Sequence, residues 1–228
     1  MGFTYRKYQV NEDYFKTWTS EMSYVLGLIF ADGNVRESSK KKGPVLRISS
    51  IDIDLLETVR SLMGSTHIIR TESNKNGTWL TLAIYSIKIV HDLISIGIKP
   101  RKSLTCTMLD VPEKYQADFI RGLFDGDGSV CEIKRHDANT PGIEVDFATG
   151  SPIFRQQLSS FLNSKLATQH GRFIERTNNN GVGIVRGSNK CSEALYGYMY
   201  NGGPCLRRKY DKYTSLISRR QLIVYNYK

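Results

Sequence analysis

The chain contains one peptide twice. YVLGLIFADGNV at residues 24–35 has a near copy in FIRGLFDGDGSV at residues 119–130. Within the first copy Gly27 and Ala31 are four positions apart, and two glycines have the same spacing in the second. Residues at this spacing share one face of a helix, and small side chains there allow two backbones to approach closely. Two unrelated amphipathic core helices would account for the leucines, but not for the matched small residues. The duplication therefore favours two equivalent halves that meet at these helices.

The segments after each copy also match. Each half continues with an alternating apolar segment, a helical pattern, a hairpin signal with Asn and Gly at its turn, and a second helical pattern. The expected order is helix, two strands, helix, two strands, helix, twice over. We predict an α+β fold of two αββαββα half-domains related by a pseudo-two-fold axis, with antiparallel sheets and the repeated helices at the seam. The expected boundaries are 1–102 and 116–228 for the half-domains and 103–115 for the linker.

Charge is the most informative bulk property. The 32 Lys and Arg residues outnumber the 22 Asp and Glu residues, which gives a net charge of +10 and favours a polyanionic partner such as nucleic acid. Four cysteines without a C-x-x-C pair suggest neither a zinc site nor a disulfide framework. No run of apolar residues is long enough for a membrane span, and no apolar leader is visible, so we expect an intracellular protein without a membrane partner. The four histidines, His67, His91, His136 and His170, show no metal-ligand spacing.

An aspartate ends each repeated peptide. Asp32 and Asp127 each precede a glycine, Gly33 or Gly128, which we expect to end a helix in the left-handed conformation. A helix C-terminus carries partial negative charge, so a carboxylate there calls for a cation. If the two helices pack together, both carboxylates and nearby carbonyls form an all-oxygen cluster that suits Mg²⁺, with Mn²⁺ as a substitute. For one such aspartate a solvated turn residue is the simpler interpretation, whereas the duplication favours a metal site. The predicted metal ligands are Asp32, Asp127, Ala31 and Gly126.

These peptides resemble a known family. VLGLIFADG at 25–33 and IRGLFDGDG at 120–128 are similar to the two signature motifs of the LAGLIDADG homing endonucleases, in their single-chain, two-motif branch. The resemblance implies a DNA-binding saddle of antiparallel sheet in a monomer that hydrolyses both DNA strands across the minor groove and leaves 3′ overhangs. It also implies that the eighth-position acids, Asp32 and Asp127, are catalytic and bind the metal. The sixth-position Asp125 is matched only by Phe30, and we assign it no catalytic role.

Two lysines are further catalytic candidates. Lys102 and Lys209 are expected in matching basic loops after the last helix of each half, and they resemble the basic residue that the family holds near its active site. An ordinary phosphate contact or a solvated loop cation is the alternative, and Arg101, Arg207 and Arg208 compete for the role. At the expected strand ends Ser50 is matched by Gly150, which has no side chain to offer, so the two half-sites are expected to be unequal.

DNA contacts are expected from the outward faces of the strands, because alternate side chains point to opposite faces of a sheet. A solvated sheet face is the equally weighted alternative for any one residue. Arginine or lysine in a major groove favours guanine. Glu144 and Asp146 are expected to brace arginines rather than to accept from cytosine, and Lys40, Lys41 and Lys42 to lie in a turn near phosphates or in water. The predicted DNA contacts are Arg36, Arg47, Ser49, Arg70, Trp79, Thr81 and Tyr85 in the first half, and Lys134, Arg135, Arg172, Arg176 and Arg186, all expected on strands, in the second.

Three functions remain open at this point. The first is a homing endonuclease that hydrolyses a long, pseudo-palindromic double-stranded DNA site with divalent metal, as in intron homing. The second is a maturase that binds intron RNA with the same fold. The third is a DNA-binding protein that does not cut. The presence of both Asp32 and Asp127 favours the first.

Overall fold

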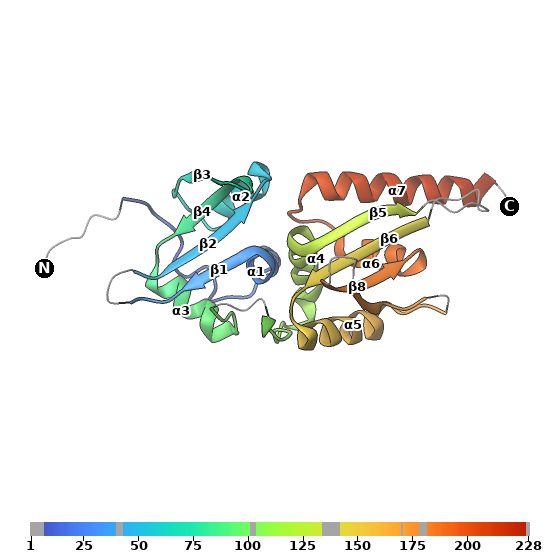
Figure 1. Ribbon diagram of the computed structural model, residues 1–228, viewed down its shortest axis with the longest axis horizontal. Helices are drawn as coiled ribbons and strands as arrows, with labels where there is room; N and C mark the ends of the chain where they lie inside the picture. The colour runs from blue at the N-terminus through green and yellow to red at the C-terminus, as the bar shows by residue number, and fades with distance from the viewer. Residues whose placement is uncertain are drawn as a thin grey trace, which may run out of the picture.

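Two halves of similar architecture lie side by side in the computed structural model (Figure 1). The structure describes residues 7–39, 43–100, 104–133, 142–169, 171–177 and 182–226, with the backbone alone for 221–226. Several residues with predicted roles fall outside these ranges: Lys40, Lys41, Lys42, Arg101, Lys102, Lys134, Arg135, His136 and His170.

The first half contains one antiparallel sheet and three helices. The sheet has the strand order β1-β2-β4-β3. Its elements are α1 (Ser20–Asp32), β1 (Gly33–Arg36), β2 (Val45–Ser50), α2 (Ile53–Leu62), β3 (Ile69–Asn74), β4 (Gly77–Ile84) and α3 (Ile87–Ile96).

The second half repeats this order and adds a helix. Its antiparallel sheet has the equivalent order β5-β6-β8-β7. In Figure 1 α2 lies at the upper edge of one half and its counterpart α5 at the lower edge of the other, as a two-fold axis along the view requires. The predicted α+β architecture is confirmed. The elements are η2 (Glu113–Tyr115), α4 (Gln116–Asp127), β5 (Gly128–Ile133), β6 (Gly142–Thr149), α5 (Pro152–Leu166), β7 (Ile174–Thr177), β8 (Gly183–Ser188), α6 (Lys190–Met199) and α7 (Arg207–Asn226).

Alternation along the strands builds the core. Four inward residues of β2 and β4 are at most 1% exposed, so they form a dry part of one face of the sheet, while the other face carries the polar side chains. Helix starts follow the expected capping chemistry. Thr19 accepts a hydrogen bond from Met22 N at the start of α1, and Ser151 accepts one from Phe154 N at the start of α5. The four buried inward residues of β2 and β4 are Leu46, Ile48, Leu82 and Ile84.

The seam is a direct contact between the backbones of α1 and α4. A Cβ at Gly122 would overlap Tyr24 O and lie 3.0 Å from Leu28 N. A Cβ at Gly27 would overlap Phe119 O and lie 2.8 Å from Leu123 N. Neither position has room for a side chain, because the atoms in the way belong to the partner helix backbone. The close approach expected from the small residues is therefore present.

The glycines that end these helices differ from expectation. Gly33 has φ −80° and Gly128 φ −84°, so both are extended, and the prediction of left-handed caps is wrong. Space explains the glycines instead. A Cβ at Gly33 would lie 2.5 Å from Ile29 O, and one at Gly128 would lie 2.5 Å from Phe124 O. The chain turns from helix into strand directly over the last helical turn, and only glycine fits there.

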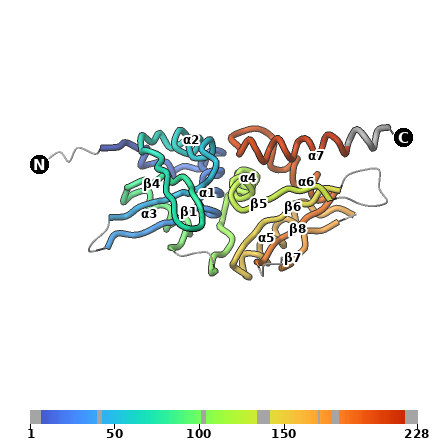
Figure 2. The backbone as a smooth tube through the Cα atoms, turned by 45° about the horizontal axis from the view of Figure 1, so that its top comes forward, coloured from blue at the N-terminus to red at the C-terminus, as the bar shows by residue number. Residues whose placement is uncertain are grey.

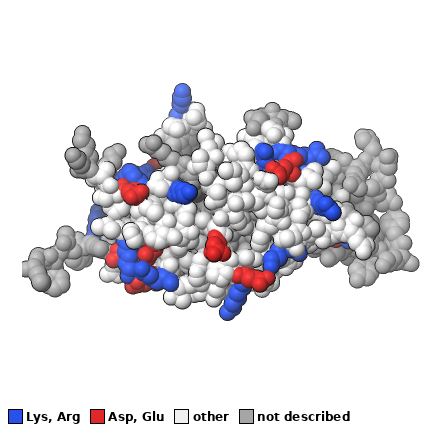
Figure 3. Space-filling model, turned by 90° about the horizontal axis from the view of Figure 1, so that it is seen from below, with Lys and Arg blue, Asp and Glu red and all other residues white. Residues whose placement is uncertain are grey.

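Two surface observations bear on possible partners. Within the described residues, no helix is both long and apolar enough to cross a membrane. The side of the molecule seen in Figure 3 carries basic and acidic side chains interspersed over a mostly uncharged surface. The described residues on that side therefore do not form a basic patch.

Candidate active site at the seam

The motif aspartates occupy the last positions of α1 and α4, the two helices that pack at the seam. Asp32 Oδ2 lies against the last turn of α4, 3.2 Å from where a Cβ at Gly126 would be. The carboxylates of Asp32 and Asp127 both raise the pKa of Lys209, which places both within electrostatic range of one ammonium group. The packing of α1 against α4 thus brings the C-terminal ends of the two motif helices together.

The oxygen donors at this place fit Mg²⁺. No three His, Cys, Asp or Glu side chains of the described residues group as a metal site, so any further protein donors to an ion held by the two aspartates would come from the main chain. The predicted ligands, two carboxylates with the carbonyls of Ala31 and Gly126, would form an all-oxygen set. Mg²⁺ is commonly bound through one or two carboxylates and keeps water and phosphate oxygens as its other ligands.

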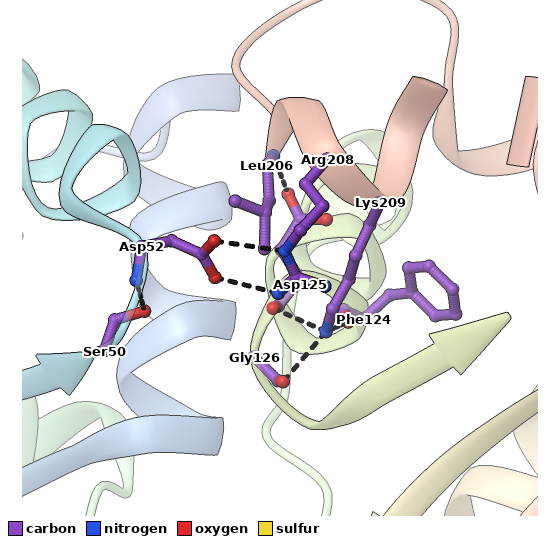
Figure 4. A network of polar contacts seen from close by, with 8 residues as sticks. All are labelled: Ser50, Asp52, Phe124, Asp125, Gly126, Leu206, Arg208 and Lys209. Atoms are coloured by element: carbon purple, nitrogen blue, oxygen red, sulfur yellow. Dashed lines mark hydrogen bonds and ion pairs between the residues drawn. The ribbon is translucent and has the colours of Figure 1, made fainter. Parts of the chain in front are cut away.

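Lys209 closes the C-terminal end of α4 (Figure 4). Its Nζ donates to Phe124 O at 2.8 Å, Asp125 O at 2.7 Å and Gly126 O at 3.0 Å. Phe124 O also accepts from Gly128 N, whereas Asp125 O and Gly126 O lie at the very end of the helix, where carbonyls lack a partner farther along it. The ammonium group therefore helps to satisfy the helix end and offsets the negative end of the helix dipole. Burial lowers the pKa of Lys209 to about 8, against the opposing effect of the nearby carboxylates. Lys209 lies in the first turn of α7 rather than in the expected loop.

The Gly126 carbonyl therefore has a partner already. A carbonyl oxygen carries two lone pairs, so the bond from Lys209 leaves one for a second ligand. Lys209 has three ammonium hydrogens and three carbonyl acceptors here, so its donor capacity is used. In this arrangement the lysine holds the helix end in shape.

Asp125 has a structural role in the same network. Its Oδ2 accepts from Tyr24 Oη of α1 at 2.8 Å and from Leu206 N, just before α7, at 2.6 Å. Burial raises the pKa of Asp125 to about 6, although both bonds favour the ionised carboxylate. Its Oδ1 is buried without a hydrogen-bond partner among the described residues. Asp125 thus joins both seam helices to the start of α7.

Arg121 anchors the connection that leads into α7. Its guanidinium is fully buried and donates to Asp118 Oδ1 at 2.6 Å, Met199 O at 2.8 Å and Pro204 O at 2.8 Å. Sequence reasoning missed this residue. The available signal was a pair of charges, Arg121 and Asp125, at helical spacing where the first motif has only apolar residues.

A salt bridge joins the two halves beside Lys209. Arg208 of α7 donates through Nε to Asp52 Oδ1 at 3.1 Å and through Nη2 to Asp52 Oδ2 at 2.8 Å. Asp52 precedes α2 of the first half, and Figure 2 shows α2 and α7 next to each other above the seam. The hydrogen bond from Arg208 lowers the pKa of Asp52. Figure 4 shows the pair pointing across the gap between the two ribbons.

Ser50 and Gly150 are not equivalent positions. Gly33 pairs with Ile48 and Gly128 with Phe147, so the counterpart of Ser50 is Thr149, whose Oγ1 accepts from Ser151 N at 3.2 Å. Ser50 ends β2, and its Oγ accepts from Asp52 N at 3.1 Å. Gly150 follows β6 and lines a cavity of about 240 Å³ beside Asp127, Ala31 and Cys106. Both strands thus end in a residue whose hydroxyl accepts from the N-cap residue of the next helix, and the prediction that Ser50 has no polar counterpart is wrong.

The polar face of the first sheet carries most of the predicted DNA contacts. Arg47 pairs with Glu72 at 3.3 Å, and Arg36 donates to Gly43 O at 3.2 Å. Thr81 is 2% exposed and shares a 3.0 Å hydrogen bond with Ser49, so it cannot reach a base, and its predicted DNA contact is wrong. Arg70 and Tyr85 are exposed, while Ser49 and Trp79 are half-buried.

The second sheet presents an arginine held by two acids. Arg186 of β8 forms a two-bond pair with Asp146 at 2.8 and 2.7 Å, and its Nη1 lies 3.0 Å from Glu144 Oε1. The acids of β6 therefore brace the arginine, the alternative favoured from the sequence. Arg176 lies exposed in β7, whereas Arg172 precedes that strand instead of lying on it.

Comparison with known proteins agrees with a chain made of two similar halves. The model of the LAGLIDADG-like domain matches residues 19–96 and 114–199. An uncharacterised protein of Methanocaldococcus jannaschii is 28% identical over 119 residues, which cover 50% of this chain and 41% of that protein.

Solved structures share the fold at low sequence identity. The homing endonuclease I-WcaI bound to its DNA recognition sequence has a TM-score of 0.59 at 17% identity, over 89% of this chain and 91% of that one. I-GzeII in complex with its DNA target has a TM-score of 0.60 at 15% identity, over 92% of both chains. I-SmaMI bound to uncleaved DNA with calcium ions has a TM-score of 0.56 at 14% identity, over 92% of this chain and 93% of that one. Because the family model covers both halves, the chain belongs to the LAGLIDADG-like domain family.

Proposed function

We propose that this protein is a site-specific endonuclease that hydrolyses both strands of double-stranded DNA. The observation that carries the proposal is the seam, where two motif helices pack backbone to backbone and end in Asp32 and Asp127 beside one lysine. Structures of the same fold are homing endonucleases bound to DNA, which supports DNA as the partner. The net charge of +10 suits the same partner.

The proposed site binds Mg²⁺, or Mn²⁺ in its place, through Asp32, Asp127 and the carbonyls of Ala31 and Gly126. A divalent cation held there would supply positive charge at the scissile phosphate and would favour attack by water. The aspartates hold the cation, and Lys209 keeps the end of α4 in the shape that presents the Gly126 carbonyl. Lys102, outside the described residues, is proposed for the matching position in the other half-site.

Each half-domain is proposed to read one half of a long, pseudo-palindromic target. Half-domains 1–102 and 116–228, joined by 103–115, would act as a monomer and leave staggered 3′ overhangs. The polar face of each sheet is the proposed reading surface, since its outward side chains alternate with the core. The residues proposed to contact DNA are Arg36, Arg47, Ser49, Arg70, Trp79 and Tyr85, with Lys134, Arg135, Arg172, Arg176 and Arg186.

A cleavage selection tests this function. Purified protein with Mg²⁺ is incubated with a random-sequence DNA library, and cut ends are captured and sequenced. The proposal predicts one long consensus with two related halves and ends offset by a constant stagger. A parallel preparation of the double variant Asp32→Asn and Asp127→Asn controls for contaminating nuclease.

Two other results would replace the proposal. If a DNA sequence is enriched by binding and none is cut, the protein is a non-cleaving DNA-binding protein. If neither occurs and intron RNA is bound specifically without metal, the protein is a maturase.

A further inference from the structure

We propose that Asp52 and Arg208 form a positioning pair through which the first half-domain sets the place of Lys209 in the second. This inference rests on the proposed function for its catalytic consequence, but not for its structural one. Asp52 belongs to the turn between β2 and α2, and Arg208 belongs to the first turn of α7. The pair therefore connects elements that are 156 residues apart in sequence.

The geometry of Asp52 supports a role other than helix capping. Asp52 holds the N-cap position of α2, where aspartate usually accepts from a main-chain N–H of the first turn, yet its side chain makes no such bond. Both carboxylate oxygens accept from Arg208. Ser50 Oγ accepts from Asp52 N and so helps to fix the turn that aims the carboxylate across the seam.

The first turn of α7 is held on two sides. Leu206 N is bonded to Asp125, and Lys209 Nζ to three carbonyls, so these contacts tie the turn to α4. Arg208 is adjacent to Lys209 and therefore points about 100° away around the helix, toward the first half. Without the Asp52 pair, the turn would keep its contacts with the second half, to α4 and through Tyr210 to Tyr196 and Tyr200, but would lose this contact with the first half. The approach of Lys209 to the helix end would then be less restrained.

The opposite side of the seam has a weaker form of the same contact. Ser151 occupies the position equivalent to Asp52, at the N-cap of α5. Its Oγ donates to Cys106 O, in the segment that follows the first half, at 2.7 Å. A neutral hydrogen bond thus stands where the other side has a two-bond ion pair. Loss of the ion pair should affect one half-site and spare the other.

Amine labelling tests the structural part without DNA or metal. Lys209 is 9% exposed, and Lys212 on the same helix is exposed and serves as internal reference. In Asp52→Asn or Arg208→Gln, acetylation of Lys209 measured by peptide mass spectrometry should rise about threefold or more relative to Lys212, because a protected group gains access when local restraint is lost. The charge-exchanged double variant Asp52→Arg and Arg208→Asp should return it to within about twofold of the original protein, as expected for a directly coupled pair.

A matched control lies on the same helix. Arg219 of α7 pairs with Glu132 at 2.8 Å, away from the seam, and Arg219→Gln should leave Lys209 labelling unchanged. If Lys209 labelling is equally low in Asp52→Asn and in the original protein, while melting temperatures show both are folded, the positioning pair is refuted.

Strand-resolved cleavage tests the catalytic part. With the two strands of a selected target labelled separately, Asp52→Asn should slow one strand about tenfold more than the other and accumulate nicked DNA, since a misplaced group near one site reduces its rate. The charge-exchanged variant should restore the ratio. If both strands slow equally, the inference fails. If the original protein cuts no target, the proposed function fails, and the labelling result still decides the positioning pair.

Discussion

Arg186 is the residue through which the predicted DNA reading by the second sheet can be tested most directly. Its guanidinium is fixed by Asp146 and Glu144, so less conformational entropy is lost when it contacts a base. We predict that Arg186→Gln relaxes the preference for guanine at one position of the second half-site, by about 1–3 kcal/mol of discrimination. Binding profiles over single-base target variants measure this. The exposed pair Arg155–Glu175 offers a control, because Arg155→Gln should leave the profile unchanged. A profile that shifts at no position would rule out base reading by Arg186.

Arg121 is the residue on which the link between the seam and α7 depends. Arg121→Met would leave Asp118 and two main-chain carbonyls without their buried partner. Removing one member of a buried ion pair costs about 3–5 kcal/mol. We expect urea unfolding to show a loss near the lower value, because Asp118 is partly exposed at 13%. A loss below 1 kcal/mol would mean that the network does not hold the fold.

Among single residues, the sequence predicted those that occur in both copies of the motif better than those that occur in only one. Asp32 and Asp127 could be singled out because each confirms the other. Arg121 and Asp125 left only a weak signal, two charges at positions where the first copy is apolar, since their partners include the main chain of Pro204 and Leu206. Contacts so distant in sequence leave no local pattern. Thr81 was misjudged because alternation gives the face of a residue and not its exposure.

The helices at the seam make a prediction about packing. In Gly122→Ala the new Cβ would meet the backbone of α1, and backbone cannot move aside as a side chain can. Overpacking costs about 1–3 kcal/mol, and we expect at least the upper value here. Gly197 in α6 is the matched control. A Cβ there meets no atom within 4 Å, so Gly197→Ala should raise stability by about 0.5–1 kcal/mol. Equal effects of the two substitutions on urea unfolding would contradict the close contact.

Element order followed from periodicity and was predicted except for the added helix α7, whereas element ends were not predicted. Helix α7 starts at Arg207, so Lys209 is helical although Gly202, Gly203 and Pro204 suggested a loop. The start of α7 is fixed by Asp125 and Arg121 of another helix, which no local signal reports. Gly33 and Gly128 were predicted to be left-handed helix caps, which is the commonest reason for a glycine after a helix. The structure shows instead that a Cβ at either position would be too close to the last helical turn.

The molecule as a whole distributes charge unequally between its two sheets. On the described polar face of the first sheet, Arg36, Arg47 and Arg70 oppose one acid, Glu72, whereas Arg186 and Arg176 oppose two acids in the second. We predict that Arg70→Gln lowers the slope of log affinity against log salt by about 0.9, the value for one lost phosphate contact. Titrations of target DNA at several salt concentrations measure the slope. Arg60→Gln, in α2, is the control and should leave it unchanged. An unaltered slope in Arg70→Gln would place that arginine away from phosphate.

The central claim is that two copies of one motif build one active site, so each copy is required. The measurement is the cleavage of a selected target with Mg²⁺, and Asp32→Asn and Asp127→Asn are tested as separate variants. The two DNA strands carry different labels, so that cutting of each strand is followed on its own. Target binding is measured in parallel, without metal. Each single variant is predicted to bind the target as the original protein does and to cut neither strand. Full cleavage of both strands by either variant would contradict the account.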